Sequence, residues 1–144
     1  MSAAINDPSV IRALLTTPAT WAVVGLSENR ARAAYGVARF LDGLGMRIVP
    51  IHPTAPVVLG WPGHAALADV PQDTRIDVVD CFVNSDQVGS VVDEAIAQRH
   101  RLGIGAIWLQ LGVVDEAAAA RALDAGLSVV MDTCPAIEHP RLGR

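Results

Sequence analysis

Short apolar runs alternate along the chain with longer stretches in which apolar residues recur every three or four positions. Runs without interleaved polar residues are typical of strands buried on both faces, and they lie at 21–24, 47–51, 77–83, 106–109 and 128–131. The periodic stretches between them predict helices. This alternation predicts an α/β fold with a mostly parallel sheet covered on both faces, and right-handed crossovers make it a doubly wound three-layer sandwich.

Local signals predict where several helices begin and end. Asp7 followed by Pro8 is an N-cap signal, so a leading helix is expected at 9–17. Glycines provide the left-handed stops of a second helix, around 37–44, and of an alanine-rich helix at 115–125.

Two segments have more ambiguous signals. Asn84 or Ser85 is expected to cap the helix after the third strand, with Gln87 closing a capping box on Asn84. The Pro- and Gly-rich stretch at 52–64 predicts a loop with a short edge strand near 57–59, followed by one helical turn.

The composition favours one globular domain. The chain has 144 residues, of which 51% are hydrophobic, enough for one sizeable core. We expect a leading helix within 1–18 and a core at 19–142. No apolar run is long enough to span a bilayer, and polar residues interrupt the N-terminal segment where a signal peptide would need an apolar core. A cytoplasmic location is therefore expected.

The charged residues and cysteines exclude several classes of partner and mechanism. The net charge is -4 with no basic stripe, so neither nucleic acid nor a membrane surface is an expected partner. All 11 basic residues are arginine, which removes Schiff-base chemistry, a pyridoxal anchor and the lysine of a P-loop. Cys81 and Cys134 have neither disulfide nor metal-ligand spacing, so both are expected to be reduced thiols and no metal site is predicted.

Ligands of doubly wound sheets sit beyond the carboxyl ends of the strands. Five corners of the chain should therefore surround one crevice: Gly25–Ser27, His52–Pro53, Asn84–Ser85, Gln110–Gly112 and Asp132–Cys134. At the first corner an apolar strand turns at a glycine into a helix. Such a turn aims unpaired N–H groups and the helix dipole at one point, which suits a phosphate, although a plain turn glycine is the alternative.

The first corner departs from the dinucleotide fingerprint G-x-G-x-x-G. It reads G-L-S-E-N-R, so only the first glycine is present. The second strand ends in Ile51, His52 and Pro53, where an NAD enzyme would carry an acid for the ribose diol. NAD is therefore disfavoured.

Segments from Trp21 to Leu142 resemble, in order, the small single-domain CoA-binding protein family. They include V-V-G-L-S-E-N-R, R-I-V-P-I-H-P and I-D-V-V-D-C-F, and the most specific are W-L-Q-L-G and C-P-x-I-E. The resemblance implies a Rossmann-like CoA-binding fold, similar to the nucleotide-binding domain of the succinyl-CoA synthetase alpha subunit. Most members of that family have no assigned reaction.

The resemblance also implies where CoA would bind. Gly25 and Ser27 would contact the diphosphate, Arg32 would supply positive charge, and the loop at 52–54 would border the adenosine. The residues expected at the site are Gly25, Leu26, Ser27, Arg30, Arg32, Tyr35, Gly36, His52, Pro53, Phe82, Val83, Asn84 and Gln110. For Gln110, support of its own loop is an equal alternative.

The chain departs from the family at several positions. His-Pro-Thr at 52–54 stands where the family usually has Asn-Pro-Lys, and Ala-Ala at 33–34 where it tends to have Pro-Ser. The family also often has basic residues around 83–84 and Thr133. Because basic side chains at these positions would stabilise a phosphate on the adenosine ribose, their absence leads us to expect weak CoA binding or a preference for a ligand without that phosphate.

No residue is predicted to be catalytic. Cys134 and His139 form a conceivable thiolate–imidazole pair, but a cysteine packed as a small hydrophobe is favoured. Asp80 lies within a strand, where it should accept hydrogen bonds from a turn or meet an arginine. Trp21 and Trp108 are expected to cover the core.

Three functions remain open. The first is a CoA- or acyl-CoA-binding module without its own chemistry, an accessory of acyl-CoA metabolism. The others are an NAD(P)-binding oxidoreductase and one component of an acyl-CoA ligase. The many apolar residues also make a homodimer plausible.

Overall fold

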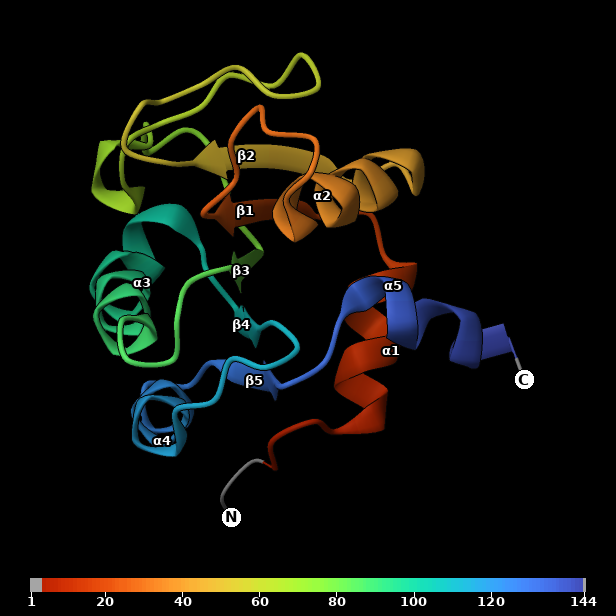
Figure 1. The fold of residues 1–144 in the computed structure, drawn as a ribbon. Helices are drawn as coiled ribbons and strands as arrows, with labels where there is room; N and C mark the ends of the chain where they lie inside the picture. Colours follow the sequence, from red (N-terminus) through yellow and green to blue (C-terminus); the bar gives the residue numbers. More distant parts are fainter. Residues whose placement is uncertain (1–3, 144) are drawn as a thin grey trace.

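The computed structural model describes residues 4–143, which form a five-stranded parallel sheet between two layers of helices (Figure 1). The spatial order of the strands is β2-β1-β3-β4-β5. Their bounds are β1 Thr20–Val24, β2 Arg47–Ile51, β3 Val78–Cys81, β4 Ala106–Leu109 and β5 Ser128–Met131. The predicted doubly wound α/β fold is confirmed, and the five strands predicted for the sheet are all present, the third being shorter than expected.

The helices cover both faces of this sheet (Figure 1). On one face lie α1 (Pro8–Thr16), α2 (Ala33–Gly43) and the short α5 (Pro135–Glu138); on the other lie α3 (Val88–Leu102) and α4 (Glu116–Asp124). Two 3-10 turns, η1 (Leu67–Asp69) and η2 (His139–Gly143), complete the elements. The sequence analysis did not predict α5 and η2. Within residues 4–143 no helix is long and apolar enough to cross a membrane.

Side-chain caps fix the starts of α1 and α4. The Asp7 carboxylate accepts a hydrogen bond from the backbone N–H of Ser9 at 2.9 Å, which confirms the predicted N-cap. The Ser9 hydroxyl and backbone bonds together lower the pKa of Asp7. At α4, the Asp115 carboxylate accepts from the N–H of Ala118 at 2.9 Å.

The predicted capping of α3 is wrong. This helix begins at Val88 with Gln87 as its N-cap and no side-chain cap. The Ser85 hydroxyl is instead used by the β4–α4 loop: it accepts from the N–H of Val114 at 3.0 Å and donates to the carbonyl of Gly112 at 3.3 Å. The Ser85 hydroxyl, which the local sequence predicts as a cap of α3, thus bonds to Val114, 29 residues further along the chain.

The predicted edge strand at 57–59 is also absent. Val58 pairs only with Trp61, through reciprocal backbone hydrogen bonds of 3.0 and 2.8 Å that close a tight turn. The rest of the loop returns beside β2, where His64 donates its backbone N–H to the carbonyl of Pro50. The helical turn expected after the loop is present as η1.

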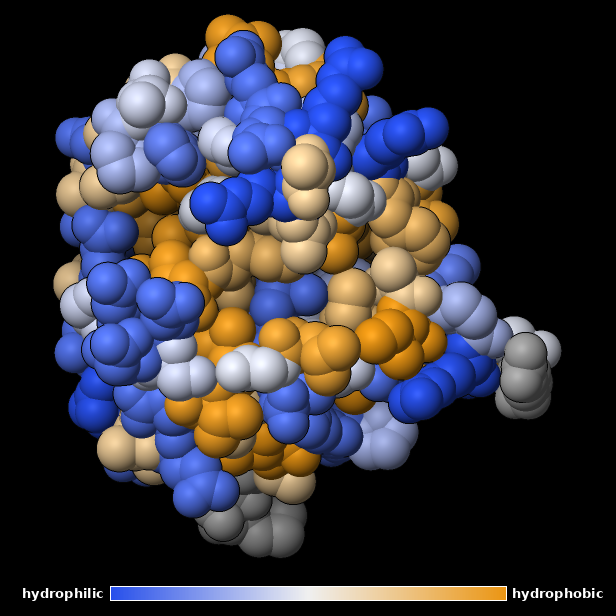
Figure 2. All heavy atoms as spheres, in the orientation of Figure 1, coloured by the Kyte–Doolittle hydropathy of each residue, from blue (hydrophilic) through white to orange (hydrophobic). Residues whose placement is uncertain are grey.

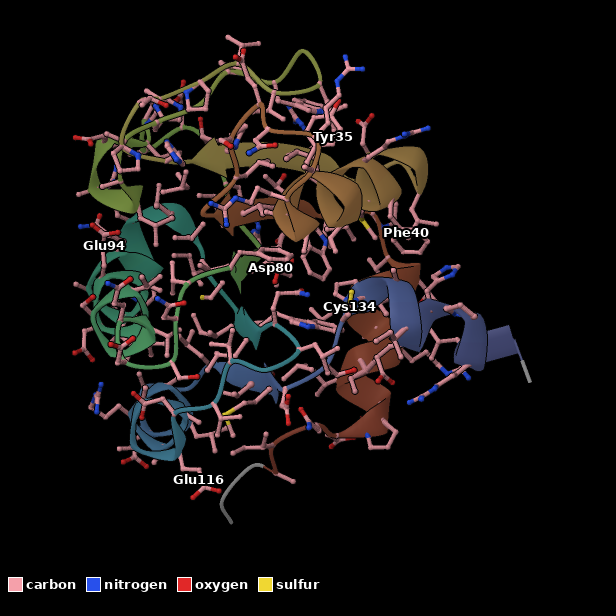
Figure 3. The ribbon with its side chains drawn as sticks, in the orientation of Figure 1. Tyr35, Phe40, Asp80, Glu94, Glu116 and Cys134 are labelled. Carbon is pink, nitrogen blue, oxygen red and sulfur yellow. The ribbon has the colours of Figure 1, made fainter. Side chains whose placement is uncertain are left out.

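The sheet face toward α1 and α2 holds two of the three tryptophans and one carboxyl group. Trp21 and Trp108 are fully buried with ring centroids 5.6 Å apart, so both cover the core as predicted. Asp80 lies on the same face, level with Val23 of β1 and Trp108 of β4 (Figure 3). Neither Asp80 oxygen has a hydrogen-bond partner among the described residues, so the predicted turn or arginine partner is wrong.

The surroundings of Asp80 explain its chemistry. Its cross-strand neighbours are apolar, and complete burial without a partner raises the pKa of its carboxyl group well above the ordinary value. Burial and the adjacent Asp80 also raise the pKa of the Cys81 thiol. Burial therefore favours the neutral form of both groups.

Polar and apolar side chains segregate on the molecular surface. Figure 2 shows hydrophilic side chains over the β1–α2 turn, side chains of both kinds over the loop after β2, and hydrophobic side chains over the β4–α4 loop and α5. The exposed large hydrophobic residues include Leu111, Val114 and Ile137. The end of this face at the β4–α4 loop and α5 therefore presents apolar side chains to solvent.

Candidate functional site

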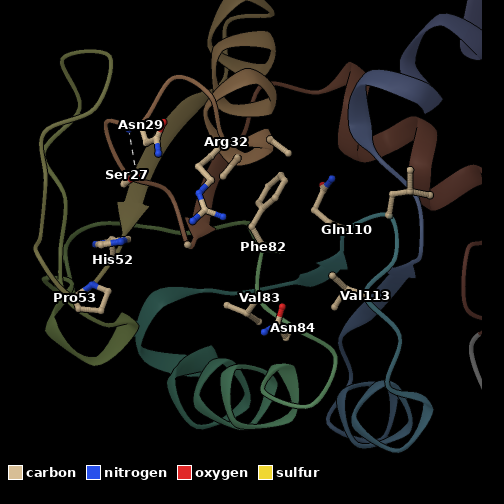
Figure 4. Close-up of a pocket in the computed structure, with 14 residues that line it drawn as sticks. Ser27, Asn29, Arg32, His52, Pro53, Phe82, Val83, Asn84, Gln110 and Val113 are labelled. Atoms are coloured by element: carbon tan, nitrogen blue, oxygen red, sulfur yellow. Dashed lines mark hydrogen bonds between the residues drawn. The ribbon is translucent and has the colours of Figure 1, made fainter.

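A cavity of about 590 Å³ lies over the carboxyl ends of β2, β1, β3 and β4 (Figure 4). It spans the point between β1 and β3 where the strand order reverses, the usual ligand position in this class of fold. Nine residues of the predicted site line it: Gly25, Ser27, Arg32, His52, Pro53, Phe82, Val83, Asn84 and Gln110. Leu111, from the predicted Gln110–Gly112 corner, also lines it. So do four residues not named for the site in advance: Asn29, Ala33, Ala34 and Val113.

The fold itself requires the glycine at the end of β1. Gly25 has φ +95°, and a Cβ added there would lie 2.5 Å from the carbonyl oxygen of Phe82. Its N–H donates to the carbonyl of Ile51 at 2.8 Å, so this amide is already used. Gly25 therefore lets the turn pass close to β3, and the groups that remain for a ligand come after it.

The β1–α2 turn presents several unused donors. The Ser27 hydroxyl accepts from the N–H of Asn29 at 3.2 Å, and Asn29 in turn accepts from the N–H of Ala31 at 3.0 Å. Helix α2 has no side-chain cap, and the N–H groups of Ala33 and Ala34 have no acceptor among the described residues. The Arg32 side chain extends from the start of α2 into the cavity (Figure 4).

Four residues of the predicted site lie outside this cavity. Leu26 is fully buried in the core. Arg30 and Tyr35 line a separate hollow, where the guanidinium lies 5.9 Å from the centre of the tyrosine ring. Gly36 lies on an exposed side of α2. Because α2 starts at Ala33, positions after its first residues turn away from the cavity.

His52 borders the cavity at the end of β2. Its Nδ1 lies 2.9 Å from the Thr54 hydroxyl and 3.3 Å from the Thr54 backbone N–H. Since the backbone N–H can only donate, Nδ1 is the acceptor and a neutral ring carries its proton on Nε2. The Nε2–H group is thus the donor that His52 can offer a ligand.

Gln110 closes the cavity at the end of β4. It is 5% exposed, and its Oε1 is buried without a hydrogen-bond partner among the described residues. Its side chain lies on the sheet face that also carries Asp80 and Trp108, because alternate residues along a strand share a face.

Cys134 and His139 lie at opposite ends of the short helix α5. Cys134 is partly buried and packs against the core cluster beneath α1 and α2 (Figure 3). The His139 ring lies edge-on to Phe40, with centroids 5.6 Å apart. Within residues 4–143 no group of three His, Cys, Asp or Glu side chains is placed to hold a metal ion.

Comparison with known proteins identifies the family. A family model described as a CoA binding domain matches residues 19–140. The chain belongs to this CoA binding domain family. The resemblance noted in the sequence is thereby confirmed. Within the same size range, the uncharacterized protein YneT of Bacillus subtilis (strain 168) is 30% identical over 129 residues, which are 90% of this chain and 91% of YneT.

Solved structures that are similar to this chain include small and large proteins. A hypothetical protein from Pyrococcus horikoshii OT3 has a TM-score of 0.85 and 29% identity, covering 100% of this chain and 99% of its own. The dinucleotide-forming acetyl-coenzyme A synthetase 1 of Ca. Korarchaeum cryptofilum, solved with phosphate and ADP, has a TM-score of 0.71 and 25% identity. That match covers 84% of this chain but 27% of the synthetase chain.

Proposed function

We propose that this chain binds CoA or a CoA derivative, with the diphosphate held at the β1–α2 turn, and acts as a binding module without chemistry of its own. The observation that carries the proposal is the convergence of the unpaired Ala33 and Ala34 amides with the Arg32 side chain on one cavity. Amides at a helix start favour an anion, and a guanidinium adds charge-assisted hydrogen bonds. Membership of the CoA binding domain family supports CoA as that anion.

The charges of the cavity bear on the adenosine end of CoA. The adenosine would lie toward His52 and Pro53, and Arg32 is the one Lys or Arg side chain among the described residues that line the cavity. If Arg32 neutralises the diphosphate, no second cation remains for the phosphate on the ribose. We therefore expect CoA and dephospho-CoA to bind with similar affinity.

A role as one component of an acyl-CoA ligase is the second candidate. The structural match to part of an acetyl-coenzyme A synthetase favours it. An NAD(P)-dependent oxidoreductase has less support, because β2 ends in Ile51 and His52 follows, so no carboxylate is available there for a ribose diol.

The first test identifies the ligand. Purified protein is denatured, any released nucleotide is identified by mass, and CoA, dephospho-CoA and NAD are then titrated separately by calorimetry. We expect heat from CoA and dephospho-CoA. Tight NAD binding with no heat from CoA would overturn the proposal.

The second test locates the site. Ser27→Leu should abolish CoA binding by filling the turn, and Arg32→Gln should weaken it about 10-fold or more, because a hydrogen bond to a charged group contributes about 1.5–3 kcal/mol. Arg39→Gln is the matched control, since Arg39 lies on the same helix, outside the cavity. An equal loss of CoA affinity in Arg32→Gln and Arg39→Gln would show that the arginine charges act only at long range and that Arg32 does not contact the ligand.

A further inference from the structure

A second cavity, of about 680 Å³, adjoins the first. It lies between α1, the end of β5 and the α5–η2 segment, and Asp132 and Thr133 of the fifth predicted corner line it. Leu111 of the β4–α4 loop lines both cavities. Together the two cavities therefore follow the carboxyl ends of all five strands.

Apolar side chains form one part of the lining of the second cavity. Leu111 is 61% exposed and Ile137 is 38% exposed, so both present apolar surface to solvent. Ile11 and Leu142 line the same cavity. Such exposed apolar surface beside a cavity is typical of a ligand site.

The charged groups of this cavity are balanced. Its described lining has two arginines and two carboxylates. Arg141 pairs with Glu138 at 3.3 Å, and Arg12 donates to the carbonyl of Leu142 at 3.1 Å. Asp132 accepts from the N–H of Gly112 at 2.7 Å. The charged side chains of the described lining therefore sum to no net charge.

The loop that carries Leu111 is held from both sides. The hydrogen bond from Gly112 to Asp132 ties it to the end of β5, and the two Ser85 hydrogen bonds tie it to the segment after β3. Asp132 adopts φ +62°, a left-handed conformation that aspartate tolerates better than most residues. Leu111 is thus presented at a fixed position between the two cavities.

We propose that the second cavity holds the acyl end of a CoA thioester, and that this end is a neutral, straight aliphatic chain. The inference rests on the proposed function: if the diphosphate lies at β1 and the adenosine toward β2, the other arm of CoA leaves along the strand ends toward β4 and β5. That direction leads past Leu111 to Ile137. The ligand class is therefore a short- or medium-chain acyl-CoA.

The test measures how affinity depends on chain length. CoA, acetyl-CoA, butyryl-CoA and hexanoyl-CoA are titrated calorimetrically into the wild type, Ile137→Ser and the control Val57→Ser, which changes an exposed apolar residue outside both cavities. In the wild type we expect the Kd to fall about fourfold for each methylene group buried, or roughly 15-fold from acetyl-CoA to butyryl-CoA. Ile137→Ser should flatten this dependence, and Val57→Ser should retain it.

The outcomes separate this inference from the proposed function. If CoA binds and the Kd is independent of chain length, or if Ile137→Ser retains the dependence, the acyl site is overturned and CoA binding stands. If neither CoA nor any thioester binds the wild type, both proposals fall. Sedimentation of the same samples provides a further check: a dimer that Ile137→Ser dissociates, with no dependence on chain length, would assign the surface to a second copy of the chain and overturn the inference.

Discussion

Ionisation of the buried Asp80 carboxyl group should make the stability of the protein depend on pH. The ordinary pKa of this group is 3.8, and burial without a partner raises it well above that in the folded state. Above about pH 4 the unfolded chain therefore releases a proton that the folded protein retains. Raising the pH then favours the unfolded state, by about 1.4 kcal/mol for each pH unit between the ordinary and the raised pKa.

Asp80→Asn removes this ionisation while nearly preserving the shape of the side chain. We expect the free energy of unfolding of the wild type to fall relative to Asp80→Asn by about 1.4 kcal/mol per pH unit within that window. Urea unfolding at several values from about pH 5 upward measures it. The slope is the diagnostic quantity, because the unpaired buried amide adds an offset that does not vary with pH.

The control for this series is Asp124→Asn, which removes an exposed carboxyl group at the end of α4. Its stability should run parallel to that of the wild type as pH rises. If the free energy of unfolding of Asp80→Asn also changes with pH in parallel with that of the wild type, Asp80 is ionised in the folded protein. The reasoning from its apolar neighbours is then refuted.

Two further changes test the local structure by urea unfolding. Gly25→Ala should destabilise the protein by more than about 1 kcal/mol, because the positive φ disfavours a side chain and the new Cβ meets the Phe82 carbonyl. The control Gly43→Ala, in open space at the end of α2, should stabilise the protein by roughly 0.5–1 kcal/mol. Similar effects at both positions would contradict the close approach of Gly25 to Phe82. Asp115→Ala should cost about 1 kcal/mol by removing the N-cap of α4, and an unchanged midpoint would show that the cap contributes nothing.

Much of the fold can be predicted because the local signals are strong. The strands at 106–109 and 128–131 match residue for residue, since consecutive buried apolar residues bounded by glycine or polar turns leave few alternatives. Asp7 before Pro8 likewise specifies the start of α1. The crevice follows from topology, because parallel strands bring their carboxyl ends to one edge.

The predictions that failed are those in which residues distant in sequence determine the local structure. Ser85 is a plausible helix cap in its own sequence, but Val114 and Gly112 of a later loop take its hydroxyl. Asp80 lacks a partner because its neighbours on β1 and β4 are apolar, which the sequence of β3 cannot reveal.

Part of the candidate site depends on distant segments in the same way. Asp132 and Thr133 line a second cavity rather than the first, because α1 and the unpredicted α5–η2 segment enclose the end of β5. The turn at Asn29 could have been found from its own side chain, since asparagine commonly accepts from an amide two residues on.

The central claim is that unpaired amides after β1 hold the diphosphate of CoA. Titration of isotope-labelled protein with CoA, followed through the chemical shift of each backbone amide, tests it most directly. The account predicts that the amides of Ser27, Ala33 and Ala34 shift most. Largest shifts at the opposite edge of the sheet, around Thr20 and Arg47 where β1 and β2 begin, would contradict it.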